Sequence, residues 1–361
     1  MTKLDQLIKG LCPNGVEYKT LEEVCTFQRG QTITAKDAVE GDVPVIAGGQ
    51  KPAYYHNQSN RAGETITIAG SGAYAGYVGY WTIPIFLSDA FSVHPHKDKL
   101  TTKYVFYFLS NLQNKIYATK KGSGVPHVHA SSISKFTIPV PPLALQNEIV
   151  RILDTFTELT AELTAELTAR KQQYEYYRNS LLSFSNTNTK QLSLKDVALI
   201  SNGKDHKSLS DGEFPVYGSG GIMRYADTYL YDKPSVLIPR KGSIGNVFYV
   251  DVPFWTVDTI FYTKINTELI LPKFLYHFLL TQDLEKMNFA GGVPSLTKSM
   301  LDKIKIPVPQ LTNQERIVKI LDRFEALCND ISVGLPAEIK ARQQQYEYYR
   351  NKLLTFKEVK A

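Results

Sequence analysis

The sequence predicts an α+β protein built as a pseudo-two-fold tandem repeat, in which two globular mixed α/β domains are separated by two long antiparallel, coiled-coil-like helices. The first observation is that residues 169–184 (ARKQQYEYYRNSLLSF) return at residues 341–356 (ARQQQYEYYRNKLLTF) with thirteen of sixteen positions identical. The second is that residues 138–154 return at 306–322, each beginning with Ile-Pro-Val-Pro and ending with Ile-Leu-Asp. Duplication on this scale indicates two units of the same design.

The repeat divides the chain into four segments. We expect a first globular domain over residues 1–142, a first long helix over 143–184, a second globular domain over 185–310 and a second long helix over 311–358. A chain of 361 residues has room for two or three domains of ordinary size.

The helix predictions rest on the spacing of apolar residues, which recur at steps of three, four or seven, as one face of a helix requires. In the first copy these residues are Ile149, Ile152, Phe156, Leu159, Leu163, Leu167, Tyr174, Tyr177 and Leu181. Two amphipathic helices on one chain are expected to pair with each other in an antiparallel arrangement.

The two helical segments differ in length by about one turn. The upstream repeats are offset by 168 residues and the downstream repeats by 172, so the second copy is longer by roughly 6 Å of helix. Tandem Thr-Ala-Glu-Leu tetrapeptides over residues 160–167 indicate a spacer in the first helix. In the second, Gly334 and Pro336 predict a kink or a new helix start.

Each globular domain is predicted to contain several short strands and a short helix. In the first domain we expect strands at residues 65–68 and 77–80, joined by a glycine-rich loop, and a helix at 103–112. The counterparts in the second domain are residues 235–238, 246–250 and 272–284. The order of the strands in their sheets does not follow from the sequence.

Composition favours a protein that stays in the cytoplasm. No run approaches eighteen apolar residues, and the first residues lack the apolar core of a signal peptide. The three cysteines, Cys12, Cys25 and Cys328, have no metal-ligand spacing and are expected to be packing residues in a reducing compartment. The net charge of +6 is compatible with a polyanionic partner and equally with an ordinary cytosolic protein.

Catalytic and ligand-binding motifs are absent or imperfect. Residues 70–76 are spaced one residue off the dinucleotide fingerprint and lie between two expected strands, so a turn or bulge is the better interpretation. Residues 292–299 resemble a phosphate-binding loop, but Thr297 stands where the second glycine is required. The sequence has neither a G-x-S-x-G elbow nor the Asn-Pro-Pro-aromatic tetrapeptide of amino-methyltransferases.

Two histidine pairs, at 94/96 and 127/129, raise the question of a metal site. Neither pair is accompanied by further ligands, and neither is repeated in the second domain. His127 and His129 in a polar loop could equally contact phosphate or base. We therefore expect no catalytic residue, no metal and no cofactor in this chain.

The loops of both domains carry side chains suited to nucleic acid. Lysines and backbone amides at glycine turns bind phosphates, while Arg, Gln, Asn and His contact base edges. In the first domain the candidates for DNA binding are Arg29, Gln31, Lys51, Tyr54, Ser71, Tyr74, Lys120, Lys121 and His127. In the second domain they are Lys204, His206, Lys207, Arg224, Arg240, Lys241, Ser243, Thr297 and Lys298. Any one of them could be an ordinary solvated loop residue, but equivalent loops recur in both domains with different side chains.

This layout resembles the specificity subunit of type I restriction-modification systems. The resemblance rests on Ile-Pro-Val-Pro before each helix, Ile-Leu-Asp within it and Gln-Gln-Tyr-Glu-Tyr-Tyr-Arg near its end, and it covers essentially the whole chain. It implies that the globular domains are target recognition domains, each reading one half of an asymmetric bipartite sequence in double-stranded DNA. It also implies that the paired helices set the unread spacer.

The resemblance further implies a subunit without catalytic activity of its own. Its partners would be two modification subunits that methylate adenine N6 with S-adenosylmethionine, and restriction subunits that use ATP and Mg. No membrane partner is expected. Two alternatives stay open: a scaffold whose helices assemble other proteins and whose domains bind peptides or glycans, and a self-sufficient nuclease or methyltransferase. Only a DNA-binding protein should lose affinity steeply with rising salt.

Overall fold

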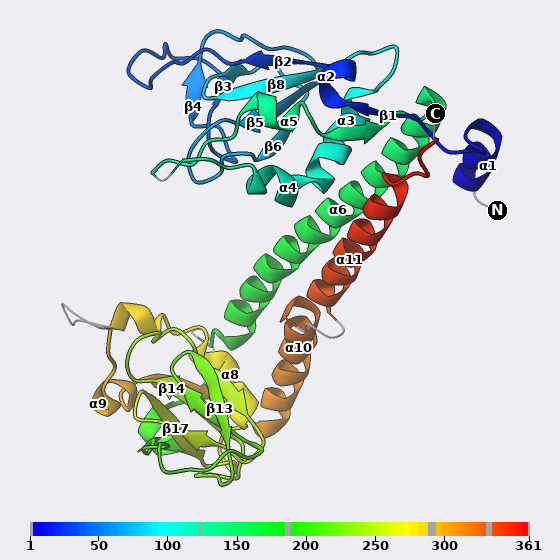
Figure 1. The fold of residues 1–361 in the computed structure, drawn as a ribbon. Helices are drawn as coiled ribbons and strands as arrows, with labels where there is room; N and C mark the ends of the chain where they lie inside the picture. The colour runs from blue at the N-terminus through cyan, green and yellow to red at the C-terminus, as the bar shows by residue number, and fades with distance from the viewer. Residues whose placement is uncertain (1–2, 123, 185–188, 288–293, 330–333, 360–361) are drawn as a thin grey trace. The chain divides into compact units, whose positions relative to one another are not determined.

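The chain divides into two units that repeat one design (Figure 1). Unit 1 comprises Met1–Glu162 and Ile339–Ala361, and unit 2 comprises Leu163–Glu338. The structure is a computed structural model and describes all residues except 1–2, 123, 185–188, 288–293, 330–333 and 360–361. Among the described helices, none combines the length and the apolar character needed to cross a membrane.

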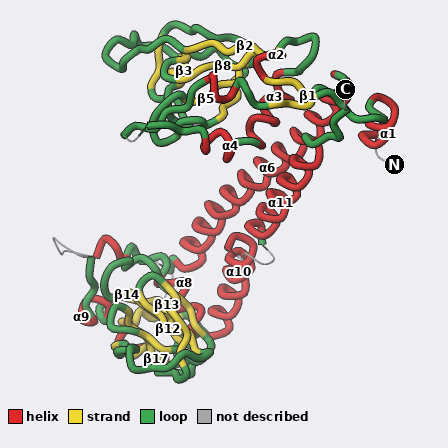
Figure 2. Tube along the Cα trace, viewed as in Figure 1, coloured by secondary structure: helices red, strands yellow, loops and turns green. Residues whose placement is uncertain are grey.

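The globular part of unit 1 is built from short strands with helices between them (Figure 2). Its strands are β1 Tyr18–Thr20, β2 Cys25–Arg29, β3 Val43–Ile46, β4 Tyr54–His56, β5 Thr65–Ala69, β6 Val78–Trp81, β7 Phe86–Leu87, β8 Ala90–Pro95 and β9 Thr137–Pro139. Its helices are α1 Lys3–Leu11, α2 Leu21–Val24, α3 Thr102–Asn111, α4 Gln113–Ala118 and α5 Ala130–Ile133. The strands form sheets in the orders β2-β8-β5-β6, β4-β3-β7 and β1-β9.

Unit 2 repeats this topology strand for strand. Its strands are β10 Lys190–Ser193, β11 Ala198–Asn202, β12 Phe214–Gly218, β13 Gly221–Ala226, β14 Ser235–Pro239, β15 Phe248–Val250, β16 Trp255–Thr256, β17 Ile260–Ile265 and β18 Lys305–Val308. Its helical segments are α7 Leu194–Val197, α8 Pro272–Leu279, the 3-10 turn η1 Leu284–Met287 and α9 Lys298–Leu301. The sheet orders, β11-β17-β14-β15, β13-β12-β16 and β10-β18, match those of unit 1.

Local sequence explains the element boundaries. Thr20 starts α2 with a capping box closed by Glu23, and Ser193 starts α7 in the same way with Asp196. The glycine-rich loop after β5 is a turn, as predicted, because Gly72 and Gly76 have φ angles of +85° and +87°.

Each unit has its own apolar core between its four-stranded sheet and its helices. In unit 1, Ile66, Val93 and Tyr104 are fully buried in one apolar cluster. In unit 2, Val236, Phe274 and Leu321 are likewise fully buried in a single cluster. The three cysteines are free and buried, which confirms that they are packing residues.

The long helix α6 (Leu143–Leu182) begins in unit 1, where it packs against α11 (Leu335–Leu353). Phe156 stacks on Tyr349 with ring centroids 5.4 Å apart. Ile149, earlier on α6, shares a cavity with Leu353, later on α11, so the two helices run antiparallel within this unit.

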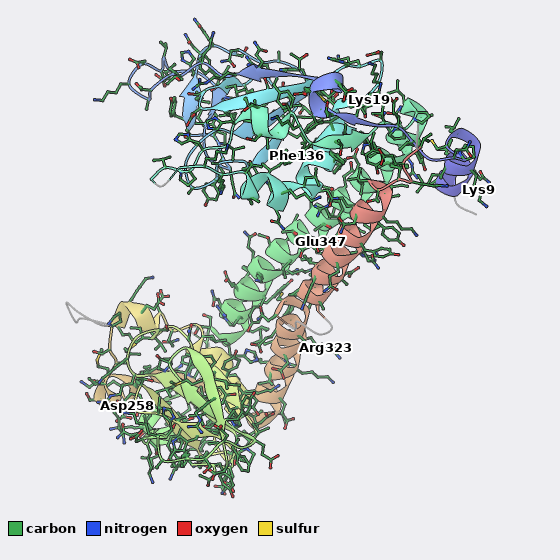
Figure 3. The ribbon with its side chains drawn as sticks, in the orientation of Figure 1. Lys9, Lys19, Phe136, Asp258, Arg323 and Glu347 are labelled. Atoms are coloured by element: carbon green, nitrogen blue, oxygen red, sulfur yellow. The ribbon has the colours of Figure 1, made fainter. Side chains whose placement is uncertain are left out.

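Within unit 2 the rest of α6 packs against α10 (Leu311–Asn329). Tyr177 stacks on Phe324 at 5.5 Å, which is the repeat equivalent of the stacked pair in unit 1. Cys328, later on α10 than Phe324, lies near Arg170 and Lys171, which are earlier on α6 than Tyr177, so these helices also run antiparallel. Arg323 on α10 and Glu347 on α11 are both exposed side chains of these helices (Figure 3).

The second helical segment is in two parts. After α10 ends at Asn329, α11 begins at Leu335 with Pro336 in its first turn. Residues 330–333, between them, lie outside the described part of the chain. The new helix start that the glycine and proline predict is therefore confirmed.

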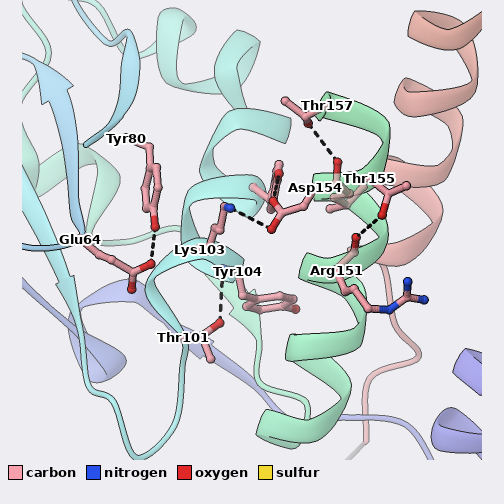
Figure 4. A network of polar contacts seen from close by, with 11 residues as sticks. Glu64, Tyr80, Thr101, Lys103, Tyr104, Arg151, Asp154, Thr155 and Thr157 are labelled. Carbon is pink, nitrogen blue, oxygen red and sulfur yellow. Dashed lines mark hydrogen bonds and ion pairs between the residues drawn. The ribbon is translucent and has the colours of Figure 1, made fainter. Parts of the chain in front are cut away.

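A buried glutamine joins each globular domain to its helix. In unit 1 the Gln146 side chain accepts a hydrogen bond from the Thr101 amide (2.8 Å) and donates to the carbonyls of Lys99 and Pro141 (both 2.7 Å). In unit 2 the Gln314 side chain makes the same three bonds, and both glutamines are fully buried. An ion pair supports each joint, Lys103 to Asp154 at 2.8 Å (Figure 4) and Lys273 to Asp322 at 2.6 Å.

The end of the chain completes unit 1. The Val16 amide donates to the Lys357 carbonyl at 2.9 Å, and the Val359 amide donates back to the Val16 carbonyl at 3.0 Å. The Tyr18 hydroxyl also donates to the Phe356 carbonyl at 3.0 Å. Residues from both ends of the sequence thus share the core of unit 1.

Candidate nucleic-acid interface

Three loops meet at one end of the four-stranded sheet in unit 1. The Gly72 amide donates to the Pro126 carbonyl at 3.0 Å, and the Val128 amide donates to the Gly70 carbonyl at 2.9 Å. Gly48, after β3, lies so close that an added Cβ would be 2.4 Å from the Ser71 carbonyl oxygen. We call residues 48–49, 70–74 and 126–129 the unit 1 loop cluster.

The same frame is present in unit 2. The Gly242 amide donates to the Pro294 carbonyl at 3.0 Å, and the Leu296 amide donates to the Arg240 carbonyl at 2.8 Å. The isolated bridge between Ser71 and His127 in unit 1 has its counterpart between Lys241 and Ser295. We call residues 218–220, 240–243 and 294–298 the unit 2 loop cluster. The backbone frame is repeated, whereas its side chains differ.

The unit 1 loop cluster borders a cavity of about 310 Å³. Arg29, Asp89, His127 and His129 line it together with Phe27, Gly70, Ala90, Phe91, Val128 and Ala130. The imidazole rings of His127 and His129 are stacked, with centroids 6.3 Å apart. The Ser71 hydroxyl donates a hydrogen bond to the Asp89 carboxylate, which holds this carboxylate beside the loop cluster.

Arg61 anchors the strand that presents Arg29. Its side chain is only 8% exposed; Nε donates to the Ser92 hydroxyl at 2.8 Å and Nη2 to the Arg29 carbonyl at 3.0 Å. Burial lowers the pKa of this guanidinium. The sequence analysis did not single out Arg61 or Asp89. Strand pairing brings Arg61 to β2 and Asp89 to the loop cluster, and this pairing does not follow from the local sequence.

The predicted residues of unit 1 fall into two groups. Arg29 and His127 line the cavity, Ser71 is in the loop cluster, and Lys121 pairs with His127 through two backbone hydrogen bonds of 2.9 and 2.8 Å. The Lys120 ammonium reaches the Ala73 carbonyl at 3.4 Å, next to the exposed Tyr74. The structure therefore places this first group of predicted residues close together at the loop cluster.

Three other predicted residues of unit 1 either have a structural partner elsewhere or are exposed in neighbouring loops. The Tyr54 hydroxyl donates to the Ile33 carbonyl at 2.6 Å and so has a structural partner. The Gln31 amide donates to the Leu87 carbonyl at 2.9 Å, with its side chain exposed. Lys51 is an exposed residue of the β3–β4 loop.

In unit 2, Arg240, Lys241 and Ser243 belong to one loop of the cluster. The Arg240 guanidinium carbon lies 5.7 Å from the centre of the Phe261 ring. Thr297 caps α9 by accepting from the Met300 amide at 3.3 Å, and Lys298 is the first residue of that helix.

The remaining unit 2 candidates lie away from this frame or are already engaged. Arg224 donates to the Asp211 carboxylate at 2.7 Å, so its charge has a partner in the free chain. Lys204 and Lys207 are exposed in the loop after β11. His206, in the same loop, has a buried Nδ1 without a hydrogen-bond partner among the described residues.

A polar joint in unit 2 brings a histidine and two carboxylates together. Ligand atoms of His277, Asp322 and Glu325 lie within 4.8 Å of one another. His277 Nε2 is 2.9 Å from one Asp322 oxygen, while the Lys273 ammonium binds the other at 2.6 Å. Burial lowers the pKa of His277, and the two carboxylates offset this only in part. Because the Lys273 ammonium also binds Asp322, we interpret this group as a set of hydrogen bonds and ion pairs that joins α8 to α10.

Fold and loop clusters together define a duplicated, helix-linked protein that presents two chemically different sets of loops on one backbone frame. The family model described as "Type I restriction modification DNA specificity domain" matches residues 13–170 and again 186–341. The chain therefore belongs to the type I restriction-modification specificity subunit family.

Individual relatives agree with this assignment. A putative type I restriction enzyme specificity subunit from Haemophilus influenzae is 32% identical over 98% of both chains. The EcoR124I/EcoR124II specificity subunit from Escherichia coli is 35% identical over 72% of each chain. The crystal structure of the type I restriction-modification S subunit from M. genitalium shares the fold, with a TM-score of 0.68, 20% identity and coverage of 94% of this chain and 96% of that one.

Proposed function

We propose that this chain is the DNA-binding specificity subunit of a type I restriction-modification complex and that it reads an asymmetric bipartite DNA target. One observation carries the proposal: both units build the same loop frame from the same backbone hydrogen bonds, yet present different side chains on it. A repeated scaffold with exchanged contact residues is what two different half-sites require.

The proposed interface contains groups for both kinds of DNA contact. Lys120, Lys121, Lys241 and the amides of the glycine turns supply phosphate contacts, which position the protein without reading sequence. Arg29, His127 and Arg240 supply donors for base edges. The other predicted residues, Gln31, Lys51, Tyr54, Ser71, Tyr74, Lys204, His206, Lys207, Arg224, Ser243, Thr297 and Lys298, remain candidates for DNA contact.

In this proposal the chemistry belongs to partner subunits. Two modification subunits would use S-adenosylmethionine to methylate adenine N6, and restriction subunits would use ATP and Mg. This chain would contribute recognition and the spacing between the half-sites and no catalytic group, with the paired helices setting the spacer.

The decisive experiment is methylation-sensitive long-read sequencing of a host that carries this gene and a modification gene, compared with the same host lacking this gene. We expect an N6-methyladenine motif of two unlike short half-sites, separated by unread bases, that disappears with the deletion. A motif that persists after deletion would refute the proposal.

A binding experiment separates the rival functions. The complex should bind the motif duplex with an affinity that falls steeply as salt rises. A protein that binds no DNA at any salt, yet still assembles partners through its helices, would be a scaffold. Methylation or cleavage by the purified single chain would instead identify an enzyme.

A further inference from the structure

Each unit places one arginine beside the same aromatic residue, but from a different element. In unit 1, Arg29 on β2 is paired across the sheet with Phe91 on β8. In unit 2 the equivalent pair is Asn202 on β11 and Phe261 on β17, so the arginine is missing from that strand. Arg240, from the loop after β14, lies over Phe261 instead.

The exchange is reciprocal. The unit 1 residue in the place of Arg240 is Gly70, since the Gly70 and Arg240 carbonyls accept the equivalent bonds from Val128 and Leu296. Gly70, Arg29 and Phe91 line the 310 Å³ cavity. Unit 1 therefore has a glycine where unit 2 has its arginine, and unit 2 has Asn202 where unit 1 has Arg29. Phe91 and Phe261 thus each have one arginine as a neighbour: Arg29 by cross-strand pairing and a shared cavity in unit 1, and Arg240 by its guanidinium in unit 2.

The Arg29 guanidinium is available for a ligand. The side chain is exposed, and it forms no ion pair or side-chain hydrogen bond within the described residues. Its backbone is fixed, because its carbonyl accepts from Arg61 at 3.0 Å and the next amide, that of Gly30, donates to the Ala90 carbonyl at 2.9 Å. A guanidinium with unoccupied donors on a firmly held strand is suited to bidentate hydrogen bonding to a ligand.

We propose, on the basis of the function proposed above, that Arg29 and Arg240 are the guanine-contacting residues of the two half-sites, one in each unit. An arginine fork matches the O6 and N7 acceptors of guanine in the major groove, and a carboxylate matches the amino group of the paired cytosine. Asp89 lines the same cavity as Arg29, so unit 1 can contact both bases of one G·C pair. In unit 2 the equivalent of Asp89 is Thr259, whose hydroxyl accepts from the Ser219 amide at 3.4 Å.

The test is selection of bound duplexes from a random DNA pool by the full chain in complex with its modification subunits. The wild-type complex should select two half-sites, each containing a required G·C pair. Arg29→Gln should allow other base pairs at that position in one half-site, and Arg240→Gln should do so in the other. Each variant should lose roughly ten- to a hundredfold in discrimination at that one position. The other half-site and the spacer should be unchanged.

Two further variants separate base contact from charge. Arg29→Lys keeps the charge but loses the fork, so it should relax the same position as Arg29→Gln while retaining the salt dependence of binding. Lys121→Gln should weaken binding to all sequences alike and leave both half-sites intact.

The outcomes are distinguishable. If the wild-type complex selects no bipartite motif, the proposed function fails, and this inference fails with it. If wild type selects a motif but Arg29→Gln and Arg240→Gln leave every G·C position intact, the inference is wrong while the proposed function stands. Relaxation of both half-sites by either single variant would also overturn the assignment of one arginine to each half-site.

Discussion

Arg61 is a buried cation whose hydrogen bonds go to a hydroxyl and to main-chain carbonyls. Replacing it with alanine leaves the Ser92 hydroxyl and the Arg29 carbonyl without this donor inside the protein. We therefore expect Arg61→Ala to lower the free energy of unfolding of unit 1 by about 2–3 kcal/mol.

The two tryptophans allow this to be measured unit by unit, because Trp81 is in unit 1 and Trp255 is in unit 2. Denaturant unfolding followed by Trp81 fluorescence in a Trp255→Phe background reports on unit 1. The exposed Arg29→Ala is the matched control and should change stability by no more than about 0.5 kcal/mol. Equal effects of the two alanine variants would contradict the anchoring role of Arg61.

His277 makes the joint of unit 2 sensitive to acid. Its side chain is fully buried between Tyr174, Asp322 and Lys273, and its folded-state pKa is lowered mainly by burial. The unfolded chain therefore takes up the proton first, and stability falls as the pH drops below the unfolded value of about 6.5. The equivalent residue in unit 1, Tyr107, donates to Asp154 and does not titrate in this range.

The measurement is unfolding of unit 2 at pH 7.5 and 5.5, followed by Trp255 in a Trp81→Phe background. His277→Tyr, which installs the unit 1 residue, should reduce the loss of stability between the two pH values. If the variant loses as much stability as the parent, His277 is not the source of the acid sensitivity.

At the scale of elements, the two buried glutamines attach each domain to its helix. Gln146→Leu leaves one amide and two carbonyls without their partner, and each unpaired buried group costs about 1–3 kcal/mol. We expect a loss of at least about 3 kcal/mol in unit 1, measured by Trp81 fluorescence. Gln344→Leu, at an exposed site on α11, should be nearly neutral.

The elements themselves could be predicted because their signals are local. The apolar stripe of α6, the glycine turn after β5 and the start of α11 at Leu335 all follow from neighbouring residues. The sheet order could not be predicted, since pairing such as β2 with β8 joins residues more than sixty positions apart. For the same reason the exchange between Arg29 and Arg240 is invisible to a residue-by-residue alignment of the two repeats.

At the scale of the whole molecule, the proposed function makes the Thr-Ala-Glu-Leu repeat a length control. Inserting one more tetrapeptide after Leu167 should lengthen α6 by roughly 6 Å and add a rotation of roughly 40°. We expect the methylated motif to keep both half-sites and to change its spacer by a base pair or more. Long-read sequencing of the host measures both, and an unchanged spacer would contradict this role for the helix.

The contacts between residues 16–18 and 356–359 have a consequence for biosynthesis. The ribosome makes the first domain early, but the α11 segment and the strand-like tail that complete its core emerge only after all of unit 2. Unit 2 can therefore fold before the core of unit 1 is complete, whereas unit 1 must wait with an open apolar surface until residues 339–359 have been made. A stop codon between residues 339 and 356 would thus damage unit 1, most of which is encoded before residue 163.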